Sequence, residues 1–206
     1  TMQVWFRPTL IIGARYGMDR VIPAIAQGMD AMRFGTGLTF TKFGQLHVGI
    51  DDPAKDERLK RLTAFFDAAG IAYIVEEDIQ YRIWSKFMIN VGLNQTCMVY
   101  GTNYAGVTAR ESLEYMTMVS AMREVMLLAH AEGVSLTEED LKFYLSLLKT
   151  FSPEATPSMG QDRINKCPSE VELFAGTVIR LAKKHGILVP TNEYLYRRVH
   201  EIEAAY

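Results

Sequence analysis

The hydrophobic pattern of this chain changes at about residue 78, and the change divides the sequence into two kinds of structure. From Arg20 to Ile50 the apolar runs are short and punctuated by glycine, as in "RVIPAIAQ", "GTGLTFTKF" and "GQLHVGIDD", which is typical of strands. After Asp78 the apolar residues recur with a helical period over long segments. We therefore expect an α+β protein, mixed α/β over residues 1–77 and all helical over residues 78–206.

The first part contains one predicted helix between strands. In "DPAKDERLKRLTAFFDAAG" a common helical face collects five apolar residues, and Gly70 follows as a stop. The five are Leu59, Leu62, Phe65, Phe66 and Ala69. "IAYIVEE" then predicts one more strand, whereas residues 1–19 show no clear period and receive no assignment.

Helix starts and stops can be read along the second part. Thr108–Glu111 and Ser169–Glu172 have capping-box form, which predicts a helix start at each. Gly133 and Gly186 follow amphipathic segments as stops. "SLTEEDLKFYLSLLKTF" and "PTNEYLYRRVHEIEAAY" add two further predicted helices.

Composition excludes several classes of protein. The 206 residues carry a formal net charge of -2, which gives no electrostatic argument for nucleic acid or an anionic membrane as a partner. No apolar run reaches the ~18 to 20 residues of a membrane span, and no signal-peptide pattern opens the chain. The two cysteines, Cys97 and Cys167, lack metal-site spacing, so no metal is expected. A cytoplasmic location is the default expectation.

Three polar residues interrupt the apolar segment "IWSKFMINVGLNQT" at a spacing of four. On a helix, Lys86, Asn90 and Asn94 would form one stripe. Burying such groups without partners costs ~1 to 3 kcal/mol each, so the stripe indicates a wet groove that holds a polar ligand. Desolvation there would lower the lysine pKa and make it a proton donor near neutral pH. The alternative is a partly exposed helix edge whose asparagines bond to loop backbone, and spacing alone does not exclude it.

A second polar cluster lies in "PSMGQDRINKCPSEVELFAG". Ser158 follows Pro157 at a predicted helix start, where its commonest role is an N-cap. Glu170 and Glu172 fall in the first turn of the next predicted helix, where the macrodipole stabilises carboxylates. Each of these residues therefore has a structural explanation. A glutamate that faced Lys86 across a cleft would instead favour a functional role.

Taken together, these segments resemble the ketopantoate reductase family (2-dehydropantoate 2-reductases). The resemblance rests on "WSKFMINVGLNQ", "PSMGQD", "SEVELFAGTVIRLAKKHGILVPTN" and the interval from Ser158 to Glu170. "RVIPAIAQGMDAMRFGTGLTFTKFGQLHVGID" is similar to the final strands of the family's nucleotide-binding domain. Residues 1–77 would then be a truncated remnant of a Rossmann-type NADP-binding domain. Residues 78–206 would be the helical domain for substrate binding and dimerisation, which leaves a homodimer open.

The resemblance implies NADPH-dependent reduction of 2-dehydropantoate to pantoate, a step towards pantothenate and coenzyme A. Lys86 would be the general acid, and Glu170 would bind the hydroxyl side of the substrate or hold Lys86. Asn90 and Asn94 would orient the substrate and the lysine, and Ser158 would hydrogen-bond the substrate carboxylate.

The glycine fingerprint of dinucleotide-binding turns, G-x-G-x-x-G, is absent from the sequence. "GTGLTF" begins correctly but has Phe40 at its sixth position, so cofactor-binding residues stay unassigned. We expect the 206-residue chain alone to bind NADPH very weakly and to be inactive. The alternatives are a reductase of another small 2-keto acid, a non-catalytic helical dimerisation module, and a 6-phosphogluconate or hydroxyacyl type of dehydrogenase.

Overall fold

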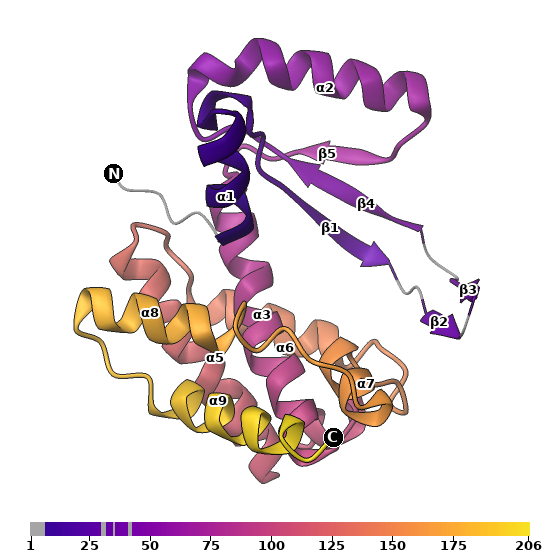
Figure 1. The fold of residues 1–206 in the computed structure, drawn as a ribbon, viewed down its shortest axis with the longest axis vertical. Coiled ribbons are helices and arrows are strands. Elements are labelled where there is room, and N and C mark those ends of the chain that lie inside the picture. The colour runs from indigo at the N-terminus through magenta and orange to yellow at the C-terminus, as the bar shows by residue number, and fades with distance from the viewer. Residues whose placement is uncertain (1–6, 30–31, 35, 41–42) are drawn as a thin grey trace. The chain divides into compact units, whose positions relative to one another are not determined.

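The structure, a computed structural model, describes residues 7–29, 32–34, 36–40 and 43–206. The described residues form two compact units, Arg7–Ile83 and Trp84–Tyr206, called here the sheet unit and the helical unit. A small sheet followed by a helical region confirms the α+β class predicted from sequence (Figure 1). Residues 1–6 of the expected first part lie outside the described residues. Within the described ranges, no helix combines the length and apolarity that crossing a bilayer requires.

The sheet unit contains a three-stranded sheet in the order β1-β4-β5, formed by β1 (Ala24–Met29), β4 (Phe43–Val48) and β5 (Tyr73–Val75). β1 pairs antiparallel with β4, with Ala24 opposite Val48, and β4 pairs parallel with β5. Parallel neighbours need a crossover, which α2 (Asp56–Ala69) supplies after the short 3-10 turn η2 (Pro53–Lys55). A separate hairpin joins β2 (Met32–Phe34) to β3 (Gly37–Thr39). β1, β3, β4 and β5 fall within or overlap the runs that predicted strands, whereas β2 lies between two of those runs.

Two features of the sheet unit differ from the sequence prediction. Residues without an assignment form α1 (Arg7–Tyr16) and the 3-10 turn η1 (Met18–Arg20). On α2, Leu59 and Phe66 are buried against Val48, but Phe65 is 61% exposed. Phe66 packs on Tyr73 of β5 with ring centroids 5.5 Å apart, and this contact turns Phe65 away from the sheet. The apolar face of the helix is therefore narrower than predicted.

An ion cluster ties β4 to the first turn of α3 (Ile79–Tyr100). Nδ1 of His47 lies 2.5 Å from Oε1 of Glu76, and Nε of Arg82 donates to the same oxygen at 2.9 Å. Burial would raise the pKa of Glu76, but the hydrogen bonds from His47 and Arg82 outweigh it and lower the pKa. The carboxylate is thus held in its charged form where α3 begins.

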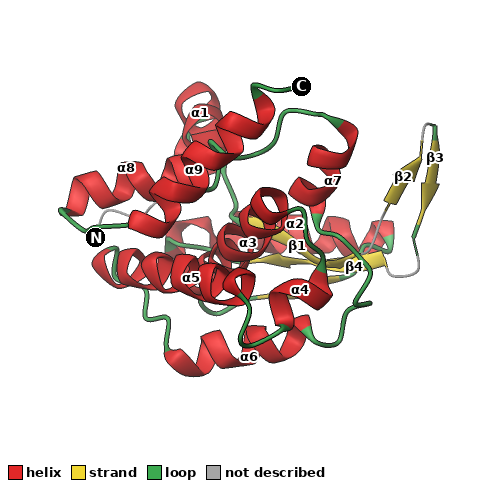
Figure 2. Ribbon diagram, turned by 90° about the horizontal axis from the view of Figure 1, so that it is seen from below, coloured by secondary structure: helices red, strands yellow, loops and turns green. Residues whose placement is uncertain are grey.

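The helical unit is built around α3. The other helices in it are α4 (Tyr104–Thr108), α5 (Leu113–Ala131), α6 (Glu138–Leu148), α7 (Ser158–Asn165), α8 (Ala175–His185) and α9 (Pro190–Glu203). Figure 2 shows α3 nearly end-on among α4, α5, α7 and α9. Trp84, Met88 and Val91 of α3 are fully or almost fully buried, as are Met118 and Met122 of α5. The core therefore lies between these two long helices.

Two predicted helix starts are wrong. Ser112, not Thr108, caps α5 by accepting a hydrogen bond from the N–H of Tyr115 at 3.0 Å. Thr108 instead ends α4, where its hydroxyl donates to the carbonyl of Tyr104 at 2.7 Å. Likewise α8 begins at Ala175, and the Ser169–Glu172 segment forms a turn before it. A capping-box spacing does not decide which neighbouring element uses the hydroxyl.

Gly92 allows α3 and α5 to approach closely. A Cβ added at Gly92 would lie 2.9 Å from the backbone oxygen of Met118, and closer still to the side chain of Met122. We expect Gly92→Ala to lower the free energy of unfolding by ~1 to 3 kcal/mol, because a backbone atom cannot yield as a flexible side chain can. Urea unfolding measures this, with Ser120→Ala on the exposed face of α5 as the control. Equal stability of the two variants would contradict the close approach.

Candidate functional site

The polar stripe lies on α3, inside the helical unit. Lys86 and Asn90 are half-buried, and Asn94 is 5% exposed. The flanking residues Trp84 and Phe87 are buried. The stripe therefore runs from partly exposed positions at Lys86 and Asn90 to a buried one at Asn94.

Asn94 connects the stripe to the start of α7. The hydroxyl of Ser158 donates to Oδ1 of Asn94 at 3.0 Å, and the N–H of Met159 approaches the same oxygen at 3.5 Å. Ser158 is the first helical residue and caps nothing, because Pro157 occupies the N-cap position. The N-cap interpretation of Ser158 is therefore wrong. Among the described residues, the amide of Asn90 has no hydrogen-bond partner, whereas Asn94 contacts the backbone at the start of α7.

Lys86 and Glu170 are close enough to interact electrostatically. Burial lowers the pKa of the Lys86 ammonium below its ordinary value, and the negative charge of Glu170 partly offsets that shift. Glu170 itself is exposed, so the carboxylate can reach solvent or a ligand. A lysine with a lowered pKa beside a carboxylate has the electrostatics of a proton donor.

Glu170 and Glu172 lie in a turn, not in the first turn of a helix as expected. Two contacts with distant residues fix the ends of this turn. The N–H of Ser169 donates to Oε1 of Glu203 at 2.7 Å, and the N–H of Ala175 donates to Oε1 of Gln95 at 3.2 Å. These contacts hold the backbone of Glu170 in place without a helix dipole.

Asp162 of α7 adds a further carboxylate to this region. Burial raises the pKa of Asp162, and the negative charges of Glu170 and Glu203 raise it further. Asp162 is therefore easier to protonate than an ordinary aspartate. The carboxylates of α7, α9 and the turn before α8 thus influence one another.

Sequence reasoning missed a buried polar network beside the stripe. Gln95 donates to the carbonyl of Val91 at 2.8 Å and contacts Oδ1 of Asn192 at 3.4 Å. Asn192 donates through Nδ2 to Glu124 at 2.7 Å. Glu124 also accepts the N–H groups of Thr191 and Asn192 at 2.8 and 2.9 Å, so its carboxylate caps α9. The only signals in the sequence were a glutamine in an apolar run and one acidic residue on the buried face of α5.

The arrangement brings four kinds of group to one part of the helical unit: an ammonium, carboxylates, amides and a hydroxyl. An ammonium with a lowered pKa can polarise a carbonyl oxygen and protonate it as negative charge develops. Amides can orient the remaining polar groups of a small ligand. Among the described residues, no group of three or more His, Cys, Asp or Glu side chains could hold a metal ion.

The fold and the site together define the class of protein: a small mixed sheet comes first, and a helical unit with a half-buried lysine follows. Residues 78–203 match the family model described as "Ketopantoate reductase PanE/ApbA C terminal". The chain belongs to the ketopantoate reductase PanE/ApbA family, as the sequence resemblance indicated.

Individual relatives are distant. The 2-dehydropantoate 2-reductase of Vibrio cholerae is 25% identical over 169 residues, which are 82% of this chain and 56% of that protein. A dimeric ketopantoate reductase from Staphylococcus aureus has a similar structure, with a TM-score of 0.74 and 22% identity over 88% of this chain and 61% of its own. The structure of a D-mandelate dehydrogenase with NADH and anilino(oxo)acetate is also similar, with a TM-score of 0.76 and 23% identity. The match covers 86% of this chain and 58% of that chain. The chain spans about half the length of the curated relatives it matches.

Proposed function

We propose that this chain supplies the substrate-binding and proton-donating side of an NAD(P)H-dependent reductase of a small 2-keto acid, with 2-dehydropantoate as the favoured substrate. The observation that carries the proposal is that Lys86, whose pKa burial lowers, lies on α3 in line with Asn90 and Asn94, where the charge of Glu170 acts on it and Ser158 contacts Asn94. Family membership and the names of the curated relatives support the substrate. The likeness to D-mandelate dehydrogenase supports the fold alone and does not choose between 2-keto acids.

The turn from β4 into α2 does not fit the pyrophosphate of the cofactor. This turn begins with two aspartates, and Oδ1 of Asp52 already accepts the N–H of Ala54 at 2.9 Å. Asp51 forms an ion pair with Lys55 at 2.8 Å. The two carboxylates thus already take up the N–H of Ala54 and the ammonium of Lys55, and their negative charges would repel an anionic ligand. The proposal therefore assigns this chain only the substrate side of the reaction.

Each stripe residue then has a defined task. The nicotinamide cofactor, when bound, would supply hydride to the keto carbon. Lys86 donates its proton to the keto oxygen, which becomes the hydroxyl of the product. Oδ1 of Asn94 already accepts from Ser158, which leaves the amide nitrogens of Asn90 and Asn94 to donate to the substrate carboxylate. The Ser158 oxygen is then placed to accept from a substrate hydroxyl, so its role differs from the carboxylate contact that the resemblance implied. Glu170 sustains the charge of Lys86.

Substrate binding can be tested on the chain as it is. Titration with ketopantoate is expected to shift the NMR signals of Lys86, Asn90, Asn94 and Ser158 most strongly. A parallel titration with benzoylformate, another 2-keto acid, tests whether the same residues also bind a different substrate. Shifts confined to other parts of the helical unit, or no shifts at millimolar ligand, would contradict the proposal and favour the non-catalytic module.

The pH dependence of turnover tests the role of Glu170. The rate requires protonated Lys86, so it falls as pH rises through the lysine pKa. Because the Glu170 charge raises that pKa, we expect Glu170→Gln to move the alkaline fall of kcat/KM to lower pH. The assay uses a polypeptide in which a complete nucleotide-binding domain precedes this chain.

Glu172→Gln is the matched control, since it removes a glutamate from the same turn without touching Lys86. Its carboxylate instead accepts a hydrogen bond from the hydroxyl of Tyr196 at 2.5 Å. An equal displacement in both variants would show that the effect is a general change of charge. An unmoved profile in Glu170→Gln would separate Glu170 from Lys86.

A homodimer stays a prediction for this chain. The support is the dimeric relative from Staphylococcus aureus. Sedimentation equilibrium of the 206-residue chain measures it directly, and a monomer at all concentrations tested would contradict it.

A further inference from the structure

A hollow of about 260 Å³ lies within the helical unit, between α4, α5 and α6. We call it the basic hollow. Its floor is apolar, because Val107, Val119 and Leu141 line it and are buried. Its rim is mostly cationic and exposed, with Arg110, Arg123, Lys142, Lys149 and one carboxylate, Glu138.

The charges on the rim do not cancel. Arg123 holds Glu138 through two hydrogen bonds, from Nε at 2.9 Å and from Nη2 at 3.0 Å, so the single carboxylate is neutralised. Lys142 makes a long, exposed ion pair with Glu139 at 3.8 Å, and its charge also acts on Glu138, whose carboxylate Arg123 already holds. Over the described parts of the chain, neither Arg110 nor Lys149 makes an ion pair or a side-chain hydrogen bond. The rim therefore carries uncompensated positive charge above an apolar floor.

We propose that the basic hollow binds a small organic anion with one phosphate or carboxylate group and a short apolar part. The anionic group would pair with Arg110 and Lys149, and the apolar part would cover Val107, Val119 and Leu141. Charge-assisted hydrogen bonds to an arginine are favourable and geometrically specific. The volume lies just below the ~300 to 1,000 Å³ of sites for drug-sized ligands, which favours a small molecule. None of these residues belongs to the candidate reductase site, so the two proposals stand or fall separately.

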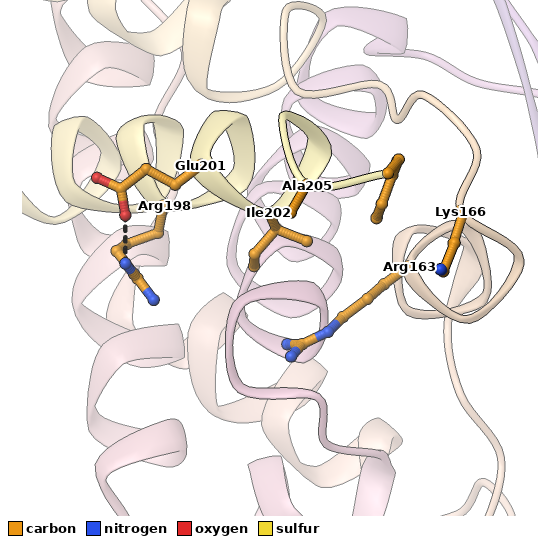
Figure 3. Close-up of a pocket in the computed structure, with 7 residues that line it drawn as sticks. Arg163, Lys166, Arg198, Glu201, Ile202 and Ala205 are labelled. Atoms are coloured by element: carbon orange, nitrogen blue, oxygen red, sulfur yellow. Dashed lines mark hydrogen bonds and ion pairs between the residues drawn. The ribbon is translucent and has the colours of Figure 1, made fainter.

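A second hollow, of about 410 Å³ beside the end of α9, does not offer the same chemistry. Figure 3 shows Arg198 paired with Glu201 along that helix. Arg163 is also engaged, because Nη1 donates to the carbonyls of Met98 and Val99 at 2.5 and 2.9 Å. Both arginines are therefore already engaged, and Lys166 is the cation that remains in the lining of this hollow.

Phenyl phosphate is a suitable probe, because it joins an anionic group to a small apolar ring. In NMR titrations of the 206-residue chain at low salt, we expect shifts at Val107, Val119 and Leu141. Inorganic phosphate should bind at least ~10-fold more weakly, since it leaves the floor uncovered. Equal affinity for the two anions would overturn the role of the floor, and the absence of shifts at millimolar phenyl phosphate would overturn the site.

Two double variants of equal charge change separate this site from general electrostatic attraction. Arg110→Gln with Lys149→Gln should weaken phenyl phosphate binding by ~10-fold or more. Arg61→Gln with Lys183→Gln removes two exposed cations outside the hollow and should leave the affinity within ~2-fold, because screening limits distant charges. Equal losses in both would overturn the proposal. Ser146→Phe, at the exposed rim, should fill the hollow and abolish binding of the ring, and undiminished binding there would also count against it.

Discussion

Replacing Lys86 by alanine is expected to lower turnover of a 2-keto acid by ~10² or more, which is the range of a lost general acid. The structure gives the reason, because burial lowers the pKa of this ammonium while Glu170 keeps part of its charge. Without it, the developing alkoxide has neither a cation nor a proton donor. Steady-state kinetics of a polypeptide with a complete nucleotide-binding domain before this chain measures the effect.

Two further variants distinguish acid catalysis from a general effect of charge. Lys86→Arg keeps the positive charge but holds its proton too tightly to donate it, so turnover should stay low while KM changes less than kcat. Lys183→Ala removes an exposed lysine of α8 and should leave both constants unchanged. Recovery of the rate in Lys86→Arg would reduce Lys86 to an electrostatic role. A normal rate in Lys86→Ala would remove it from the mechanism.

The stripe could be predicted from sequence because its geometry is local. A spacing of four places Lys86, Asn90 and Asn94 on one line of any helix, whatever surrounds it. The bond from Ser158 to Asn94 joins residues 64 positions apart, and no spacing rule reaches that far. The family resemblance brought both residues into one site, but it did not give the direction of that bond.

The turn that carries Glu170 shows why local rules failed elsewhere. Ser169–Glu172 satisfies the capping-box spacing, yet distant acceptors on Glu203 and Gln95 take the backbone N–H groups of Ser169 and Ala175. The N–H groups of Leu173 and Phe174 still donate to the carbonyl of Glu170, but the bond from Ala175 to Gln95 interrupts the local pattern, so the continuous helix begins only at Ala175. In the sheet unit the strands were predictable because glycines bound short apolar runs, whereas the pairing order depends on contacts distant in sequence.

Gln95 illustrates a second limit. The sequence shows that this amide is unusual, because it stands in an apolar run. Its hydrogen-bond partners come from α3, α8 and α9, so only the folded structure identifies them. The network that it joins ends at Glu124, which is 8% exposed. Since Gln95 also anchors Ala175, the network links α3, with Lys86, to the turn that carries Glu170. We therefore expect that breaking this hydrogen-bond network would lower the stability of the helical unit and also disturb the position of Glu170.

Glu124→Ala is accordingly expected to lower the free energy of unfolding by ~3 to 5 kcal/mol. The substitution leaves the part-buried N–H of Thr191 and the buried N–H of Asn192 without their acceptor, and the amide of Asn192 keeps only its longer bond to the carbonyl of Ala121, at 3.3 Å. It also removes a carboxylate from the N-terminus of α9, where the helix dipole favours negative charge. Urea unfolding followed by circular dichroism measures the change.

Glu138→Ala is the matched control for the Glu124 substitution. It removes a carboxylate that also accepts two hydrogen bonds, from Arg123, but at an exposed position. Water replaces those bonds, so the loss should be ~1 kcal/mol or less. The difference between the two variants isolates the cost of unsatisfied buried donors from the loss of a charge. Similar losses in both would show that water reaches the start of α9 and that Glu124 does not hold the helical unit together.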